Sequence, residues 1–212
     1  MYTLFYYPCN ASLAPHFVLK SINAPYQLEL VDRKKMAQKS AQYLSLNPTG
    51  RIPTLVDDDF ILFESAAICL YLAEKHPEAA LIPIDIKQKA IFNQWLMYLT
   101  STLQTELMTY FYPERHTQNA LIYDDIVRTQ QTRLKDVLQI IDKQLNDNTY
   151  LVGESITVCD YILFMLCIWA DEIQHPPLSF SNLNRYLKTM ARNEAIQQAC
   201  KIEEISLAAY SI

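Results

Sequence analysis

The first third of the chain alternates between strand-like and helix-like patterns of apolar residues. Apolar and polar positions that alternate, or short aromatic and β-branched runs, indicate strands, whereas apolar positions three and four apart indicate helices. These patterns predict strands over residues 2–7, 26–31, 54–57 and 60–63 and helices over residues 12–23 and 65–75. The resulting order, β-α-β-(α)-β-β-α over residues 1–76, is typical of an α/β domain.

The rest of the chain carries only helical patterns. Residues 77–86 contain two prolines and are expected to form a linker. An apolar residue recurs every four positions over residues 91–111, and a second amphipathic pattern covers residues 121–146. We therefore expect an all-helical domain over residues 87–212.

A third helix in this part has a strong predicted start. Thr157 is followed three residues later by Asp160, which matches a capping box with Asp in place of the usual Glu. The apolar run from Tyr161 to Ala170 is too short to span a membrane and is expected to be buried on all sides. We interpret Thr157 and Asp160 as residues that stabilise the fold and not as catalytic residues.

Composition and charge narrow the class of protein. The chain has 212 residues, half of them hydrophobic, which suits one large or two small globular domains. A net charge of −5 without a run of Lys and Arg disfavours a nucleic-acid surface. Five scattered cysteines and four isolated histidines predict neither a disulfide scaffold nor a metal site, which fits a reducing compartment. With neither a signal-peptide pattern nor a membrane span, we expect a cytoplasmic protein.

The stretch from Phe5 to His16 places Cys9 and Ser12 where a strand passes into a helix. A helix N-terminus gathers unpaired N–H groups and a partial positive charge, and both favour a thiolate. The alternative is structural, with an inert, buried Cys9 and a Ser12 that only caps the helix. These residues alone leave both interpretations open.

Three motifs make the chain resemble the cytosolic glutathione S-transferase family. They are NPTGRIPTL at residues 47–55, FESAAICLYLAEK at residues 63–75 and YLVGESITVCDYILF at residues 150–164, and the resemblance covers essentially the whole chain. It implies a thioredoxin-like domain followed by an all-helical domain, usually in a homodimer. It also implies glutathione as co-substrate, a small and mostly apolar electrophile as second substrate, and no covalently bound cofactor.

The resemblance also implies a glutathione site in the first domain. In the family the bond before the residue equivalent to Pro53 is cis, and the backbone of Ile52 then pairs with the cysteinyl part of glutathione. Ser65, at a helix N-terminus, suits the γ-glutamyl carboxylate, and Glu64 suits the ammonium.

Four further residues are weaker candidates for ligand contacts. Arg51 and Lys35 are placed to meet the glycyl carboxylate of glutathione, although exposed, solvated charges are the commoner case. Tyr98 and Tyr110, on the long helical pattern, are candidates for the wall of an apolar substrate pocket, with core packing as the alternative.

Members of the family differ in the group beside the glutathione sulfur, and this chain offers Tyr6, Cys9 and Ser12. The chain is broadly similar to the bacterial beta class. That class has a Cys at the position of Ala11 and a His at the position that matches Gln104, so its thiol and its His are missing here. The pattern from Cys9 to Ser12, C-x-x-S, resembles that of omega-class and glutaredoxin-like proteins.

Three functions follow from this resemblance. In the first, Tyr6 or Ser12 holds the thiolate of glutathione for attack on an electrophile. In the second, Cys9 exchanges disulfides with glutathionylated substrates. In the third, the protein is a non-catalytic scaffold, as some bacterial regulators are. The whole-chain resemblance favours the first, and Pro53 with Glu64 and Ser65 favours glutathione binding over the third.

The five thiols are expected to differ in reactivity. Cys69, Cys159 and Cys167 fall in apolar or closely packed helical patterns and should be inert. Cys200, near the C-terminal end, is the other candidate for an exposed thiol. We expect Cys9 to be the most reactive, with a pKa below that of an ordinary thiol.

Overall fold

The structure, a computed structural model, describes residues 1–211. Contacts divide the chain into two compact units. One unit is Met1–Ile82 together with the C-terminal segment from Ala191 onward, and the other is Pro83–Met190. The sequence assigned the C-terminal segment to a helical domain over residues 87–212, whereas its contacts group it with the first unit.

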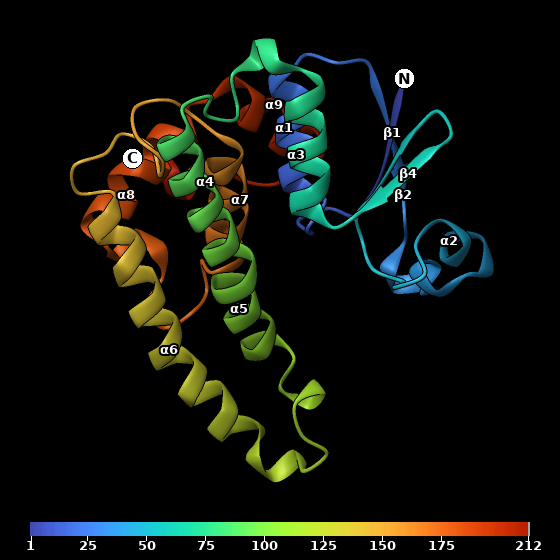
Figure 1. Cartoon of the computed structure of the whole chain (residues 1–212). Coiled ribbons are helices and arrows are strands. Elements are labelled where there is room, and N and C mark those ends of the chain that lie inside the picture. The colour runs from blue at the N-terminus through green and yellow to red at the C-terminus, as the bar shows by residue number, and fades with distance from the viewer. Residues whose placement is uncertain (212) are drawn as a thin grey trace. The chain divides into compact units, whose positions relative to one another are not determined.

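A four-stranded mixed sheet forms the centre of the first unit (Figure 1). Its strands, in the spatial order β2-β1-β3-β4, are β1 (Tyr2–Tyr6), β2 (Tyr26–Leu30), β3 (Thr54–Asp57) and β4 (Phe60–Phe63). Strand β2 runs parallel to β1, β3 runs antiparallel to β1, and β4 runs antiparallel to β3. The predicted hairpin is therefore confirmed, and Asp58 in its turn has φ of 55°, a conformation that Asp tolerates.

Four helices accompany the sheet: α1 (Leu13–Ser21), α2 (Ala41–Leu46), α3 (Ser65–Lys75) and α9 (Glu194–Ile202). Helix α1 packs against both α3 and α9. Side chains alternate between the two faces of β1, so Tyr2 and Leu4 are buried on one face while Phe5 points to the other. There Phe5 packs on a small cluster of Val31, Tyr43 and Ile52.

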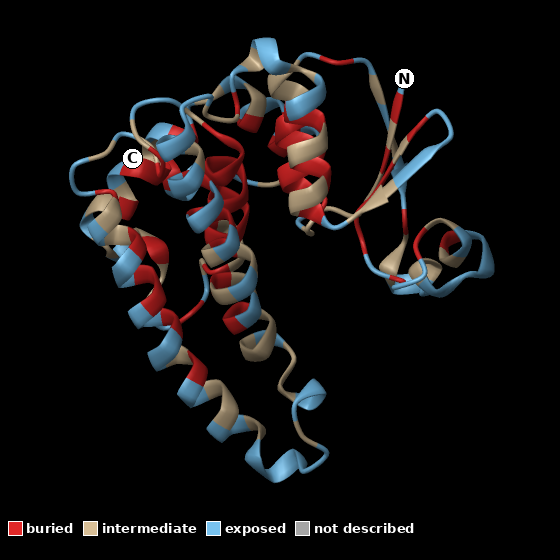
Figure 2. Cartoon of the chain, viewed as in Figure 1, coloured by how far each residue is buried: buried red, intermediate tan, exposed pale blue. Residues whose placement is uncertain are grey.

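The second unit is helical throughout its regular structure. Its helices are α4 (Ile86–Tyr98), α5 (Gln104–Phe111), α6 (Tyr123–Gln144), α7 (Val158–Trp169) and α8 (Ser181–Met190). Every residue of α7 from Val158 to Cys167 is buried (Figure 2). The run from Tyr161 to Ala170 is therefore buried on all sides as predicted except at Ile168 and Trp169, which are partly exposed. Within residues 1–211, no helix is both long and apolar enough to cross a membrane.

Asp160 organises the start of α7 through a capping box, as the sequence predicts. One carboxylate oxygen accepts the Thr157 N–H at 2.7 Å and the Thr157 hydroxyl at 2.9 Å. The other accepts the Leu151 N–H at 2.9 Å and the Tyr186 hydroxyl at 3.0 Å. Burial raises the pKa of Asp160, and these four donors offset the cost of removing its carboxylate from water.

A π-helical turn, Leu99–Leu103, joins α4 to α5. Residues four apart drift by about 40° around an α-helix, because one turn holds 3.6 residues. The wider π turn offsets part of this drift and keeps the middle of the four-residue stripe on one face. The buried members are Trp95, Leu99, Leu103 and Leu107, whereas the ends of the stripe, Ile91 and Phe111, are 39% and 41% exposed.

Candidate functional site

The register of the sheet brings the ends of several segments together. Strand β3 begins at Thr54, which pairs with Phe5 near the end of β1 and with Phe63 at the end of β4. Strand β2 ends at Leu30, beside Tyr6. Strands β1, β2 and β4 therefore end, and β3 begins, at the same end of the sheet. The segments that follow the first three strands and the segment that leads into β3 all meet the sheet there.

Most of the residues predicted from the sequence lie in those segments or directly beside them. They are Tyr6, Cys9, Ser12, Lys35, Arg51, Ile52, Pro53, Glu64 and Ser65. The remaining two candidates, Tyr98 and Tyr110, belong to α4 and α5 of the second unit. The fold thus gathers residues from four separate stretches of sequence at one edge of the first unit.

The Ile52–Pro53 peptide bond is cis, as the resemblance implies. The carbonyl of Arg51, just before it, accepts the Tyr43 hydroxyl at 2.7 Å and the Asn47 side-chain amide at 2.9 Å. Within residues 1–211 the N–H of Ile52 has no backbone partner. The neighbouring backbone is therefore fixed while this amide remains available to a ligand.

Two residues that support this segment were not predicted from the sequence. Asn47 and Tyr43 are buried, and both bond to the Thr54 hydroxyl, at 3.1 Å and 2.9 Å respectively. Gly50 is also favoured here, because its φ is +59° and a Cβ would lie 3.0 Å from the backbone carbonyl oxygen of Gln38. The asparagine of the NPTG stretch was the available signal for this support.

Helix α3 begins at Ser65 with an unusual backbone. Glu64, the residue before it, has φ of 74°, which non-glycine residues rarely adopt. The Ser65 side chain is 8% exposed, and its hydroxyl has no hydrogen-bond partner within residues 1–211. A buried hydroxyl beside the unpaired N–H groups of a helix N-terminus is suited to a carboxylate.

Cys9 lies in the turn between β1 and α1 and is exposed. Its φ is 53°, and its N–H donates to Glu203 Oε2 at 3.2 Å. Strain of this kind at a non-glycine residue is often found at functional sites. Among the five cysteines, Cys9 is the exposed one.

The other four thiols are buried. Cys200 is 1% exposed, so the expectation that it is a candidate for an exposed thiol is wrong, because α9 packs against α1. Burial raises the pKa of Cys159 and Cys167, and it raises the pKa of Cys200 to about 12. These thiols are therefore held in the protonated, unreactive form.

Ser12 lies under the same turn with its side chain fully buried. Its hydroxyl donates to the Tyr7 carbonyl at 3.2 Å and accepts the Tyr7 N–H at 3.3 Å. It makes no side-chain cap to α1, which differs from the alternative considered from the sequence. The Ser12 hydroxyl thus donates and accepts one hydrogen bond within the protein, and it stabilises the turn.

Tyr6 is partly buried at the end of β1. Burial raises its pKa, and the charges of Glu203 and Glu204 raise it further, so it remains a protonated donor at neutral pH. Arg51 is exposed, and Lys35 is exposed with its Nζ 3.4 Å from Asp32 Oδ2. Among the described residues 1–211, neither cation makes a buried contact that would fix its position.

The two candidate tyrosines of the second unit, Tyr98 and Tyr110, each meet a neighbouring aromatic ring edge-on. The Tyr98 hydroxyl is buried without a hydrogen-bond partner within residues 1–211, and burial raises its pKa. Its ring meets that of Trp95 edge-on, with 5.4 Å between ring centroids. The ring of Tyr110 meets that of Phe111 in the same way, at 5.2 Å.

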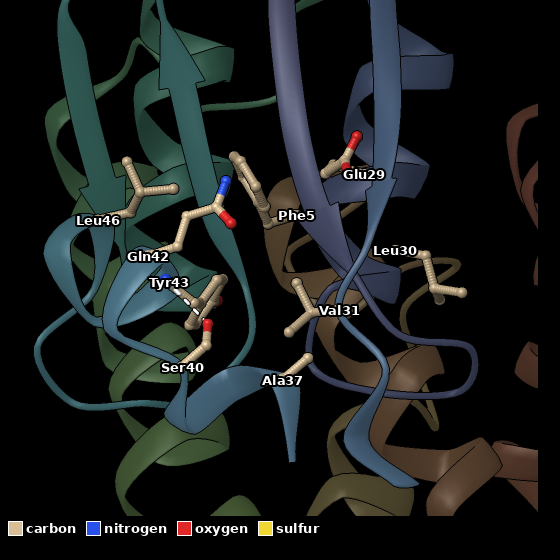
Figure 3. A pocket seen from close by; sticks show the side chains of 9 residues that line it. All are labelled: Phe5, Glu29, Leu30, Val31, Ala37, Ser40, Gln42, Tyr43 and Leu46. Carbon is tan, nitrogen blue, oxygen red and sulfur yellow. Dashed lines mark hydrogen bonds between the residues drawn. The ribbon is translucent and has the colours of Figure 1, made fainter. Parts of the chain in front are cut away.

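A separate hollow is lined by residues of α2, of the sheet and of the segment between them (Figure 3). It encloses about 390 Å³ of empty space, including its open mouth, and Phe5, Val31 and Tyr43 are among its lining residues. None of the candidate residues named above lines it. Within residues 1–211, no group of three or more His, Cys, Asp or Glu residues is placed to hold a metal ion.

Comparison with known proteins identifies the family. The models for the N-terminal and C-terminal domains of glutathione S-transferase match residues 1–74 and 103–194. Glutathione S-transferase GstA of Escherichia coli O157:H7 is 29% identical over 203 residues, covering 94% of this chain and 98% of that protein. A glutathione S-transferase of Xanthomonas campestris pv. campestris is 28% identical, covering 96% and 99%.

The solved structures agree with the sequence comparison. A glutathione transferase homolog from Sulfitobacter, solved with bound glutathione, has a TM-score of 0.90 at 25% identity and covers 97% of this chain and 99% of that one. The bacterial transferase BphK has a TM-score of 0.84 at 28% identity and covers 96% of this chain. With matches to both domains of one family and relatives along nearly its full length, the chain belongs to the glutathione S-transferase family.

Proposed function

We propose that the protein binds glutathione at the end of the sheet in its first unit and transfers the glutathionyl group to small, mostly apolar electrophiles. The observation that carries this proposal is the buried Ser65 hydroxyl at the start of α3, which has no hydrogen-bond partner within residues 1–211. A γ-glutamyl carboxylate there would complete its hydrogen bonding and meet the positive end of the helix. The glutathione bound in the Sulfitobacter homolog supports the same ligand.

The other contacts of glutathione follow from the strand ends. The N–H of Ile52, beside cis Pro53, is available to pair with the cysteinyl backbone as an added strand would. Glu64 would take the γ-glutamyl ammonium, and the exposed Arg51 and Lys35 the glycyl carboxylate. The sulfur would then lie near the turn that holds Cys9, with Tyr6 as a further donor.

Titration calorimetry of the native protein with reduced glutathione tests the binding. We expect saturable heat below millimolar glutathione, and the absence of any heat at millimolar concentration would overturn the proposal. Turnover is tested separately with a panel of aryl halides and enones, which react by loss of halide or by addition of the thiolate. Binding without turnover on any member of the panel would favour a non-catalytic scaffold.

A second candidate function is thiol transfer by Cys9, and one contrast supports it. Cys9 is exposed, whereas the hydroxyl of Ser12 is buried and already paired with Tyr7. The Cys9 thiolate would attack the glutathione sulfur of a glutathionylated substrate and release the substrate thiolate. A glutathione thiolate would then attack the mixed disulfide, releasing oxidised glutathione and restoring Cys9.

Mass spectrometry after incubation with oxidised glutathione distinguishes the two functions. Thiol transfer predicts one added glutathione on a peptide that contains Cys9, and loss of the reaction in Cys9→Ala. Conjugation that survives Cys9→Ala would assign the sulfur contact to Tyr6 instead. In that variant the four buried thiols serve as the internal control.

We further propose that the second unit of each chain supplies apolar residues to the pocket for the electrophile, including Tyr98 and Tyr110. We also propose that the protein is a cytoplasmic homodimer. The family membership supports the dimer, as do Phe60 and Ile61, which are 46% and 40% exposed on β4 at the edge of the sheet. Light scattering at micromolar concentration tests it, and a species with the mass of one chain would contradict it.

A further inference from the structure

The C-terminal segment contributes a buried acid to the Cys9 turn. The side chain of Glu203, at the end of α9, is fully buried, with Oε1 2.7 Å from His16 Nδ1 in α1. Its other oxygen, Oε2, accepts the N–H of Cys9 at 3.2 Å. His16 Nε2 lies 2.8 Å from the Tyr26 hydroxyl. One carboxylate therefore connects α9, α1 and the turn that precedes α1.

The backbone of Glu203 is itself fixed by the way α9 ends. Glu204 adopts φ of 57°, its N–H donates to Lys201 O at 3.4 Å, and the Ile205 N–H donates to Cys200 O at 2.8 Å. This pair of bonds is the Schellman arrangement, which sets the direction in which the chain leaves a helix. The carboxylate of Glu203 is thus aimed from a rigid helix end.

His16 fixes the orientation of the carboxylate. With Glu203 as a carboxylate, which only accepts hydrogen bonds, His16 Nδ1 is the donor of this bond. The imidazole is completely buried and is held on its far side by Tyr26. The pairing of His16 and Glu203 explains how α9 attaches to α1, but it uses only one of the two carboxylate oxygens.

The second oxygen accepts a hydrogen bond from a residue whose backbone conformation is strained. Cys9 has a left-handed backbone, which costs a non-glycine residue about 1 kcal/mol or more and persists only where its surroundings hold it. We propose that Glu203 is a positioning residue for Cys9: through the Cys9 N–H it holds the turn that aims the thiol at the bound ligand. The inference rests on the role proposed above for Cys9.

Two substitutions of Glu203 separate hydrogen bonding from packing. Glu203→Gln keeps an oxygen for the Cys9 N–H, and its amide N–H can donate to His16 Nδ1 once the proton of His16 moves to Nε2. Glu203→Met keeps similar volume but offers no comparable acceptor. Glu204→Gln is the matched control, because this neighbour is also acidic, whereas the acceptor of the Cys9 N–H is Glu203.

Amide hydrogen exchange gives a direct readout that does not depend on glutathione. We expect the Cys9 N–H to exchange at least about tenfold faster in Glu203→Met, and within about twofold of the native rate in Glu203→Gln and Glu204→Gln. Unchanged exchange in Glu203→Met would overturn the proposal, whether or not the protein binds glutathione. If Glu203→Met does not fold, Glu203→Asp, which withdraws the carboxylate by one methylene, should show faster exchange in the same place.

Kinetics of thiol transfer then tests the consequence for Cys9. In Glu203→Met we expect kcat to fall about tenfold with KM for glutathione unchanged, because the Ser65 end of the site is not altered. Glu203→Gln should restore kcat. A fall in kcat that Gln does not rescue, or a parallel rise in KM, would make Glu203 a structural residue only. If the native protein shows no thiol transfer, the second candidate function fails, and the exchange result alone decides the placement of Cys9 by Glu203.

Discussion

Two helix starts in this molecule solve the same local problem in opposite ways. At α7, Asp160 accepts four hydrogen bonds in a completely buried box. At α3, Ser65 is buried as well, but its hydroxyl has no partner within residues 1–211, and Glu64 before it is in an unfavourable conformation. Both starts gather unpaired N–H groups, yet only one of them is completed by the protein itself.

The difference separates residues of folding from residues of function. A polar group that is fully paired by its own chain contributes stability and has no capacity left for a ligand. A buried polar group without a partner costs stability unless something else completes it, so its presence favours a binding role. By this criterion the start of α7 has a structural role, whereas the start of α3 is assigned to the proposed glutathione site.

Substitution of Asp160 should give the largest effect on stability. Asp160→Ala leaves donors of Thr157, Leu151 and Tyr186 buried without an acceptor, and we expect a loss of about 3 kcal/mol or more in the free energy of unfolding. Urea denaturation measures this loss. Asp160→Asn keeps part of the box and should lose less, and equal losses in the two variants would contradict the role assigned to these bonds.

Alkylation of the five thiols should show the same contrast as a difference in rate. Cys9 is exposed, whereas Cys159 and Cys167 lie within buried α7, where burial raises their pKa. We expect iodoacetamide to label Cys9 at least about 100-fold faster than either of them at pH 7.5. Quantitative mass spectrometry of the labelled peptides measures the rates. Labelling of Cys9 no faster than Cys200 would show that its turn is inert.

Substitution of Ser65 should affect binding and spare the fold. Ser65→Ala removes a hydroxyl that has no hydrogen-bond partner in the described part of the chain, so the free energy of unfolding should change by less than about 1 kcal/mol. Its affinity for glutathione should fall by about 1–3 kcal/mol, the range for a charged group that lacks one hydrogen bond. Calorimetry measures the affinity, with Ser45→Ala on exposed α2 as the control. A Ser65→Ala variant that binds glutathione normally but is clearly less stable would contradict this, because Ser65 would then serve the fold as Asp160 does.

The pH dependence of stability should show a smaller effect in the second unit. Hydrogen bonds from Arg133, and then from Gln130, lower the pKa of Glu106. A carboxyl with a lowered folded-state pKa stabilises the protein above its unfolded-state pKa, and this contribution disappears as pH falls through the folded-state value. The free energy of unfolding of the native protein should exceed that of Glu106→Gln by about 1–2 kcal/mol at pH 7. At pH 3 the difference should be much smaller. Urea titrations at both pH values, with Glu114→Gln as an exposed control, test this.

The local elements were predictable because their signals are local. The hairpin of β3 and β4, the helix from Ser65 to Lys75 and the capping box at Thr157 each depend on residues within a few positions of one another. The π turn was not predicted, although a strict four-residue stripe is itself a departure from the 3.6-residue period. That departure was the signal that could have found it.

The parts of the site that escaped prediction depend on contacts between distant residues. Nothing near Cys200 in the sequence reveals that α9 packs on α1 and buries it. The bond from Cys9 to Glu203 joins residues with no shared pattern, and Ser12 turns back to Tyr7 instead of capping its helix. Spacing along the chain predicts which residues line a turn, but the partner of a buried side chain is decided by packing.

The attachment of α9 to the first unit has a consequence for biosynthesis. Cys9 and Glu203 are separated by 194 positions, and the whole second unit is encoded between the two parts of the first. Because a nascent chain emerges from its N-terminus, the Cys9 turn leaves the ribosome long before the acid that supports it exists. The first unit is therefore completed last, and a product that terminates before residue 203 carries the thiol without its support.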